Sequence, residues 1–181
     1  PELRVVGPGN PGEEAGDGGG ETMLPTALAN TGDNAIVDWV LVELRDAATP
    51  ATIVATRPAL LQRDGDVTDI NGSSPVALLA ATGSYKVAVR HRNHLGVMTN
   101  AASTLNTTTP VAIDLSSPGT AVYGTAARKE VNGVSLLWAG NALRDGQIKY
   151  TGGGNDRDPI LLQVGSTTPN GTVSGYFPED V

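Results

Sequence analysis

The stretch that begins at Asn141 has the residue types of a calcium-binding loop. Such loops place oxygen donors at alternating positions, a glycine that permits a sharp turn after the third donor, and an apolar anchor to the core. Positions one, five, six and eight of this pattern are matched by Asn141, Asp145, Gly146 and Ile148. Leu143 departs from it, because position three normally supplies a side-chain oxygen. The alternative is an Asp-Gly hairpin turn with solvated acids behind it.

Two further aspartates, Asp156 and Asp158, come later than the usual closing carboxylate of such a loop. The intervening residues 150–155 read Tyr-Thr-Gly-Gly-Gly-Asn and can fold out as a loop that brings either carboxylate back. Hard cations prefer carboxylate and carbonyl oxygens, so we expect Ca²⁺ here. The candidate ligands are Asn141, Asp145, Gln147, Asp156 and Asp158.

A second acidic cluster lies within residues 64–71. Its three carboxylates repel one another, and a divalent cation would relieve that repulsion. A solvated turn explains the same residues equally well. The candidate metal ligands in this cluster are Asp64, Asp66 and Asp69.

No group of residues has the pattern of a catalytic site. His91 and His94 are the only histidines, there is no cysteine, and no Gly-x-Ser-x-Gly motif presents a serine nucleophile. We therefore expect the two histidines to hydrogen-bond within the fold and the protein not to be an enzyme.

The composition argues against two classes of binding partner, nucleic acid and the membrane interior. The net charge is −7, which argues against nucleic acid because nucleic acid rewards clustered lysine and arginine. No run of about 18 apolar residues is present, so we expect no membrane insertion. Glycine and proline are abundant and charged residues make up 17% of the chain, which favours strands and turns.

Residues 36–45 are the clearest predicted strand. Alternate side chains are Ile36, Val40, Val42 and Leu44 on one face and Val37, Trp39 and Leu41 on the other. Because both faces are mostly apolar, this is best interpreted as an inner strand covered on both sides, with Trp39 packed rather than stacking on sugars.

The remaining pattern predicts an all-β protein, an antiparallel β-sandwich or jelly-roll-like fold. Short apolar runs separated by turn residues give candidate strands at 22–28, 36–45, 52–56, 59–62, 74–79, 85–92 and 111–115. Residues 121–123 and 134–138 are either two further strands or one strand and a short turn. We divide the chain into an extended arm (1–21), a β-sandwich (22–118) and C-terminal strands with a calcium-loop appendage (119–181).

The amino-terminal arm is rich in glycine and proline, which is typical of a disordered linker. Its first residues differ, because Leu3, Val5 and Val6 form a short apolar run. A short strand on a flexible tether suits addition to the sheet edge of another molecule.

The segments 137–141 and 156–161 together resemble the dockerin-like calcium repeat of large secreted bacterial surface proteins. Residues 34–40, 60–66 and 91–96 resemble the β-module that precedes this repeat. The resemblance implies export to the cell surface and calcium binding more firmly than any activity. It also implies a second loop after Glu179 and Asp180, which we expect to be absent or completed by another molecule.

Together these features predict an extracellular structural subunit that self-assembles into a filament, tube or surface layer. Its partners would be other copies, joined by the arm residues Leu3, Val5 and Val6, by the acidic end at Glu179 and Asp180, and by calcium. The alternative is a carbohydrate-binding or anchoring β-module of a larger secreted bacterial protein, with glycans as partners.

Overall fold

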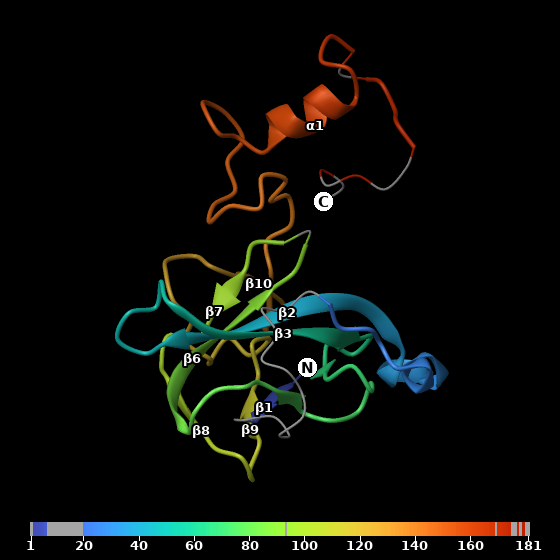
Figure 1. The fold of residues 1–181 in the computed structure, drawn as a ribbon. Helices are drawn as coiled ribbons and strands as arrows, with labels where there is room; N and C mark the ends of the chain where they lie inside the picture. Colours follow the sequence, from blue (N-terminus) through green and yellow to red (C-terminus); the bar gives the residue numbers. More distant parts are fainter. Residues whose placement is uncertain are drawn as a thin grey trace.

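The computed structural model describes residues 2–6, 20–92, 94–168, 170–174, 177 and 179, and it has the all-β fold predicted from the sequence (Figure 1). The main strands are β1 (Leu3–Val6), β2 (Ile36–Asp46), β3 (Ile53–Gln62) and β6 (Gly83–Arg90). Shorter strands are β4 (Val67–Thr68), β5 (Val76–Ala77), β7 (Val97–Met98), β8 (Ser103–Leu105), β9 (Val111–Ile113), β10 (Lys129–Val131) and β11 (Val134–Leu136). The helical elements are η1 (Pro25–Ala29), η2 (Gly32–Asn34) and α1 (Arg157–Gln163).

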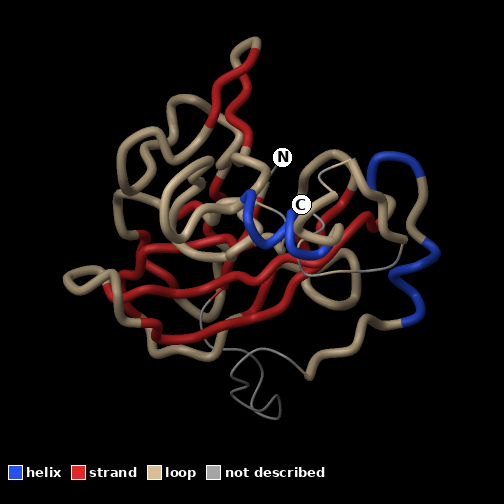
Figure 2. Tube along the Cα trace, turned by 90° about the horizontal axis from the view of Figure 1, so that it is seen from above, coloured by secondary structure: helices blue, strands red, loops and turns tan. Residues whose placement is uncertain are grey.

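The first nine strands form one sheet in the order β5-β1-β4-β3-β2-β6-β7, with β8 added to β6 and β9 added to β1. Seen from above, the long strands run side by side across the molecule (Figure 2). The expectation of a purely antiparallel arrangement is wrong in one place, because β1 pairs in parallel with both β4 and β5. Strands β10 and β11 pair with each other as a separate hairpin.

Strand β2 is the centre of this sheet, paired antiparallel with β3 on one side and β6 on the other. Its residues Val40, Val42 and Leu44 are buried, as the alternation predicts. The opposite face is less covered than expected, since Val37 is 53% and Trp39 is 37% exposed. The prediction that both faces of this strand are packed is therefore wrong at its amino-terminal end.

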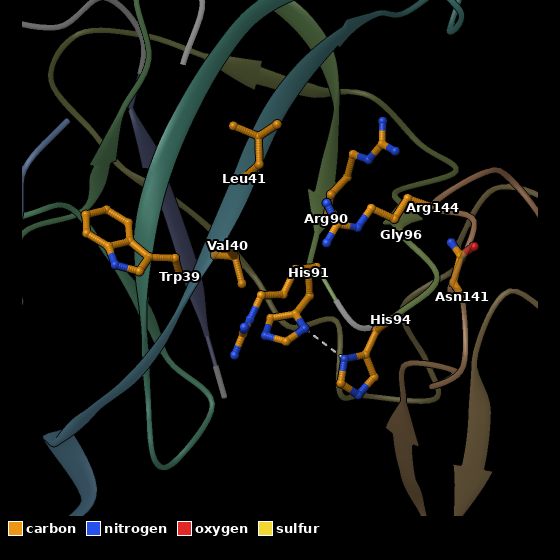
Figure 3. Close-up of a pocket in the computed structure, with 10 residues that line it drawn as sticks. Trp39, Val40, Leu41, Arg90, His91, His94, Gly96, Asn141 and Arg144 are labelled. Atoms are coloured by element: carbon orange, nitrogen blue, oxygen red, sulfur yellow. Dashed lines mark hydrogen bonds between the residues drawn. The ribbon is translucent and has the colours of Figure 1, made fainter. Parts of the chain in front are cut away.

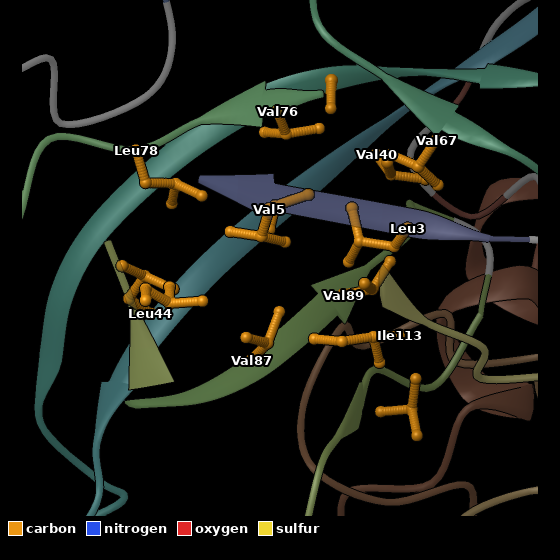
Figure 4. Close-up of a cluster of buried hydrophobic side chains, with 14 residues drawn as sticks. Leu3, Val5, Val40, Leu44, Val67, Val76, Leu78, Val87, Val89 and Ile113 are labelled. Atoms are coloured by element: carbon orange, nitrogen blue, oxygen red, sulfur yellow. The ribbon is translucent and has the colours of Figure 1, made fainter. Parts of the chain in front are cut away.

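Strand β1 completes the core. Leu3 and Val5 are almost fully buried, at 3% and 0% exposure, and they lie among side chains of β2 and β6 (Figure 4). The same cluster continues into the short strands through Val67, Val76, Leu105 and Ile113. The first strand therefore belongs to the same hydrophobic core as the centre of the sheet.

Proline explains two differences between predicted and observed elements. Residues 22–28 do not form a strand, because Pro25 opens the 3₁₀ helix η1. The strands predicted at 52–56 and 59–62 are one strand, β3, which runs through Pro58. Pro58 has no backbone N–H to donate. This is tolerated because β4 pairs only with Leu60 and Leu61, so the edge of β3 at Pro58 that faces away from β2 is unpaired.

The C-terminal segment joins the sheet through two isolated bridges, Thr99 to Val122 and His94 to Ala139. Of the two alternatives predicted there, the second fits: residues 134–136 form a strand, and residues 121–123 contribute only the bridge. Helix α1 buries none of its side chains and lies apart from the strands in Figure 1. In the part of the chain that is described, no helix has the length and apolar character needed to span a bilayer.

Candidate functional site

The predicted calcium loop begins with a tight turn closed by its own side chains. The amide Nδ2 of Asn141 donates to the carbonyl oxygen of Asp145 at 2.9 Å, and the backbone N–H of Asp145 donates to Asn141 Oδ1 at 3.2 Å. The N–H of Gln147 donates to Asp145 Oδ1 at 2.9 Å. Asn141 is buried, whereas Asp145 and Gln147 are exposed, so these three candidate ligands sit on one turn that opens to solvent.

The glycine-rich run does fold out as a loop and return Asp156. Its carboxylate, 5% exposed, accepts the backbone N–H of Leu143 at 3.1 Å and that of Lys149 at 2.8 Å. The N–H of Asp156 donates to the carbonyl of Lys149 at 2.8 Å. Because each oxygen of Asp156 accepts a backbone N–H bond, this side chain closes the 141–156 loop.

Asp158 is not brought back in the same way. Its Oδ2 accepts Nδ2 of Asn155 at 2.8 Å, and Oδ1 lies 3.3 Å from the guanidinium of Arg157. The bond from Asn155, followed by that from Arg157, lowers the pKa of Asp158. The guanidinium of Arg157 also lies over the ring of Tyr150, 5.2 Å from its centre. Asp158 thus belongs to an exposed polar group at the start of α1.

The second acidic cluster is divided between different partners. Asp69 is buried and pairs with Arg57, Oδ1 to Nη2 at 2.7 Å, and it also accepts the N–H of Ala77 at 3.0 Å. Asp66 Oδ1 accepts the N–H of Glu2 at 2.6 Å, beside β1. Asp64 Oδ1 accepts the N–H of Asp66 at 3.0 Å.

The structure therefore does not gather Asp64, Asp66 and Asp69 around one point. Within the described residues, no three side chains of the histidine, cysteine, aspartate or glutamate types are placed to hold a metal ion together. Asp69 is used to neutralise a buried arginine, a role that its position in the sequence does not reveal.

The residues predicted to join copies lie at the two ends of the chain. In the single chain, Leu3 and Val5 are buried within its own sheet rather than free on a tether, and Val6 pairs with Ala77 of β5. Glu179 borders a hollow beside Asn155 and Asp158, whereas Asp180 lies outside the described residues.

The two histidines form a chain of polar contacts that reaches β2. His91 Nε2 lies 3.2 Å from Asp38 Oδ2, and His91 Nδ1 lies 2.8 Å from His94 Nδ1. If the Nε2–H of His91 faces Asp38, the Nδ1 of His91 accepts a hydrogen bond from the Nδ1–H of His94. Arg92 also contacts Asp38 Oδ2, at 3.1 Å.

The pKa shifts of Asp38 and His94 follow from burial and from neighbouring charges. Burial by itself would raise the pKa of Asp38, but the backbone N–H of Trp39 and the guanidinium of Arg92 outweigh it, and the pKa is lowered. For His94, burial and the neighbouring His91 lower the pKa, while Asp38 acts in the opposite direction. Asp38 is therefore the ionised anchor of this group at neutral pH.

A hollow of about 410 Å³ opens beside the histidines (Figure 3). Its walls come from β2, from the end of β6 and from the loop after Gly140. The lining side chains that carry or can carry positive charge are Arg90, His91, Arg92, His94 and Arg144. Arg90 and Arg144 both line this hollow, and in Figure 3 the ring of Trp39 points away across β2.

A larger hollow of about 670 Å³ adjoins the first and shares Arg90, Gly96 and Arg144 with it. It covers the outer face of β2 and β6, where Glu43 is 1% exposed. Arg45 holds Oε2 of Glu43, and Arg90 lies 3.7 Å from Oε1. The wall contributed by the C-terminal segment includes Tyr123, which is 52% exposed.

Sequence reasoning missed this cationic surface because Arg144 is distant in the chain from Arg90, His91, Arg92 and His94. Arg90 is opposite Leu41 in the β2–β6 pairing, which brings Asp38 towards His91 and Arg92, but only the register of the two strands shows it. The approach of Arg144 depends on the bridge between His94 and Ala139. No local motif signals either contact.

No protein-family model matches this chain, and neither the curated proteins nor the solved structures include a match. The resemblance to the dockerin-like repeat therefore rests on its motifs alone.

Proposed function

We propose that this protein is an extracellular structural subunit that self-assembles into a filament, tube or surface layer by exchanging β1 between copies. The position of β1 carries the proposal. It pairs with β4, β5 and β9, and it places Leu3 and Val5 in the core. A body without β1 would expose both unpaired backbone and apolar surface, so this position needs an occupant from the same chain or from a neighbour.

The sequence after β1 suits such an exchange. Residues 7–19 are rich in glycine and proline, and a stretch of that length can span at most about 45 Å. Exchange of an identical element creates no new type of contact, so the same pairs that stabilise the closed chain would join two chains. Assembly then depends on concentration and on how fast β1 leaves its site.

The β10–β11 hairpin offers a second contact between copies. Val131, Val134 and Leu136 are between 43% and 47% exposed, and among the described strands the hairpin pairs only with itself. Its turn is tight, because Asn132 and Gly133 both have positive φ, at 52° and 78°. Short exposed strands with apolar side chains favour pairing with another chain.

Calcium is the proposed stabiliser of the assembled form. Copies with a net charge of −7 repel one another, and a divalent cation at an acidic loop reduces that repulsion. The turn that holds Asn141, Asp145 and Gln147 is open to solvent, and Asp156 closes the loop behind it. The carbonyl and carboxylate oxygens there suit Ca²⁺ better than softer metals.

The cysteine-free sequence permits a direct test of exchange. Arg4 and Ala112 are exposed partners in the β1–β9 pairing, so we would prepare Arg4→Cys and Ala112→Cys as separate chains. When the two are mixed and oxidised, a disulfide between them forms only if β1 of one chain docks on the other. We expect a covalent heterodimer that increases with concentration. A mixture of Arg4→Cys with Thr52→Cys, on a remote exposed turn, is the control.

Electron microscopy with calcium and with EDTA tests the assembly itself. Ordered polymers that shorten or disperse in EDTA are the expected result. Monomers at high protein and calcium concentration, with no disulfide between mixed chains, would contradict the proposal.

The alternative function, a carbohydrate-binding or anchoring module, has support from a different observation. The two adjoining hollows lie where an exposed tyrosine and several arginines meet. Because β1 folds onto its own body in the single chain, a self-contained binding module is consistent with the same fold. Binding to a glycan array by a strictly monomeric protein would favour this alternative.

A further inference from the structure

We infer that His91 and His94 form a proton-sensitive latch: when both imidazoles are protonated, the turn after β6 releases the chain from Trp138 onwards. This inference depends on neither β1 exchange nor calcium. The pair stands where the C-terminal segment meets the sheet, because His94 bridges to Ala139 and the backbone N–H of Leu95 donates to the carbonyl of Trp138 at 2.8 Å. The side chains that respond to acid are therefore on the same turn as these backbone contacts.

The contact between the two imidazoles requires an unprotonated nitrogen. Their Nδ1 atoms are 2.8 Å apart, a hydrogen-bond distance, and the rings meet edge to face with their centres 4.8 Å apart (Figure 3). A neutral imidazole has one N–H and one lone pair, whereas a protonated imidazole has two N–H groups and no lone pair. With one proton added to the pair, one Nδ1 can still accept from the other. With two protons added, the two Nδ1–H groups oppose each other and the bond is lost.

Asp38 favours placing the first of these protons on His91. Its Oδ2 lies 3.2 Å from His91 Nε2, and an adjacent carboxylate stabilises positive charge. The pKa of Asp38 is lowered below 3.8, so this carboxylate stays ionised while histidines titrate. The second proton must then enter His94, whose Nδ1 faces the charge already present on His91.

This second protonation is unfavourable while the turn is closed. Burial and the neighbouring His91 lower the pKa of His94 below its ordinary value of 6.5, against the opposite effect of Asp38. An opened turn therefore takes up the proton more readily than a closed one, so opening becomes easier as the pH falls below 6.5. The other charged side chains that line the hollow beside the histidines are Arg90 of β6, Arg92 of the same turn and Arg144 of the C-terminal loop.

The C-terminal segment has a second attachment to the sheet, without a histidine. Thr99 bridges to Val122, and the backbone N–H of Tyr123 donates to the carbonyl of Met98 at 2.8 Å. This attachment should persist when the histidines are protonated. Acid would therefore free the chain locally from Trp138 onwards, together with the 141–156 loop, rather than detach the whole segment.

Hydrogen exchange of the full chain, resolved to single amides by mass spectrometry, tests the latch at about pH 7.5 and about pH 4.5 with EDTA present. The N–H of Leu95 reports the latch, and the N–H of Tyr123 is the internal control. After correction for the intrinsic pH dependence of exchange, we expect protection of Leu95 to fall at least about tenfold while Tyr123 keeps its protection. Unchanged protection of Leu95, or an equal loss at both amides, would overturn the inference.

Two variants separate protonation from packing. His94→Asn places an amide N–H near the position of Nδ1, so it can donate to His91 without titrating, and Leu95 should stay protected at both pH values. His94→Ala cannot form the bond, and Leu95 should already have lost about tenfold in protection at about pH 7.5. Melting curves at neutral pH confirm that each variant folds. An acid-dependent loss in His94→Asn equal to that of the parent, or full protection in His94→Ala, would overturn the assignment.

Discussion

The β-sheet body and the C-terminal loop segment of this protein bury different kinds of side chain. In the body, the buried residues are mainly aliphatic, among them Val42, Leu44 and Val87, all at 0% exposure. In the segment from Asn141 to α1, the most buried side chains are mainly polar, with Asn141 and Asn155 at 3% exposure. Large apolar side chains there, Leu143, Ile148 and Leu162, are more than 40% exposed.

This difference indicates which interactions stabilise each region. Burial of apolar area is insensitive to pH and to ions, so the body should keep its structure under a wide range of conditions. Side chains that accept backbone N–H groups work through charge, and their contribution changes with protonation and with bound cations. The C-terminal segment is thus the region expected to respond to calcium.

The largest expected effect is in the body. Leu44→Ala removes a fully buried side chain and should lower the free energy of unfolding by about 2–5 kcal/mol. Leu162→Ala in α1, at a position 68% exposed, is the matched substitution and should change it by less than about 0.5 kcal/mol. Urea unfolding of both variants measures the contrast. A similar loss from both would show that α1 packs on the body.

An intermediate effect is expected at the loop. Asp156→Asn leaves only one oxygen to accept the two N–H groups of Leu143 and Lys149, which should weaken the local structure by about 1–3 kcal/mol. Hydrogen exchange measured by mass spectrometry should accelerate across residues 141–158 and stay unchanged in β2 and β6. Asp158→Asn, at an exposed position, is the control. Faster exchange throughout the sheet would mean that the two regions unfold together.

The smallest effect is expected at Asp38, where the sheet meets the turn that contacts the C-terminal segment. Its pKa is below the ordinary value of 3.8, so its contribution is present above that value and is lost as the pH falls through the folded pKa. At neutral pH, Asp38→Asn should destabilise the protein by about 1 kcal/mol or less, because the side chain is partly exposed.

Thermal melting of Asp38→Asn and the parent protein from neutral pH to about pH 3 provides the measurement. The two melting temperatures should converge at the acidic end. A constant difference across this range would show that Asp38 acts through packing rather than charge.

The sequence was sufficient to predict the elements that depend on a local pattern of residues. Alternation located β2, because the side chains of a strand alternate between its faces, and short apolar runs between turn residues located β6 and predicted an all-β fold. It also indicated the 141–158 loop and the return of one of its late aspartates, since glycine-rich runs fold out between polar residues. Pro58 misled the prediction, because a proline at an unpaired strand edge looks the same in sequence as one that ends a strand.

What the sequence did not reveal depends on pairing over long separations. The parallel contacts of β1, the ion pair of Arg57 with Asp69 and the shared lining of two hollows by Arg90 and Arg144 each involve residues whose spacing follows no periodicity. Trp39 was expected to be covered because its strand is apolar on both sides, yet cover depends on what crosses that end of the sheet. Such features follow from register and topology.

The place of β1 in the sheet has a consequence for biosynthesis. It precedes every other strand in the chain, yet its antiparallel partner β9 ends only at Ile113. A ribosome must therefore make most of the body before this strand can dock, and such long-range closure is slow compared with hairpin formation. During that delay, neighbouring nascent or newly released chains would meet before this position in their sheets is filled.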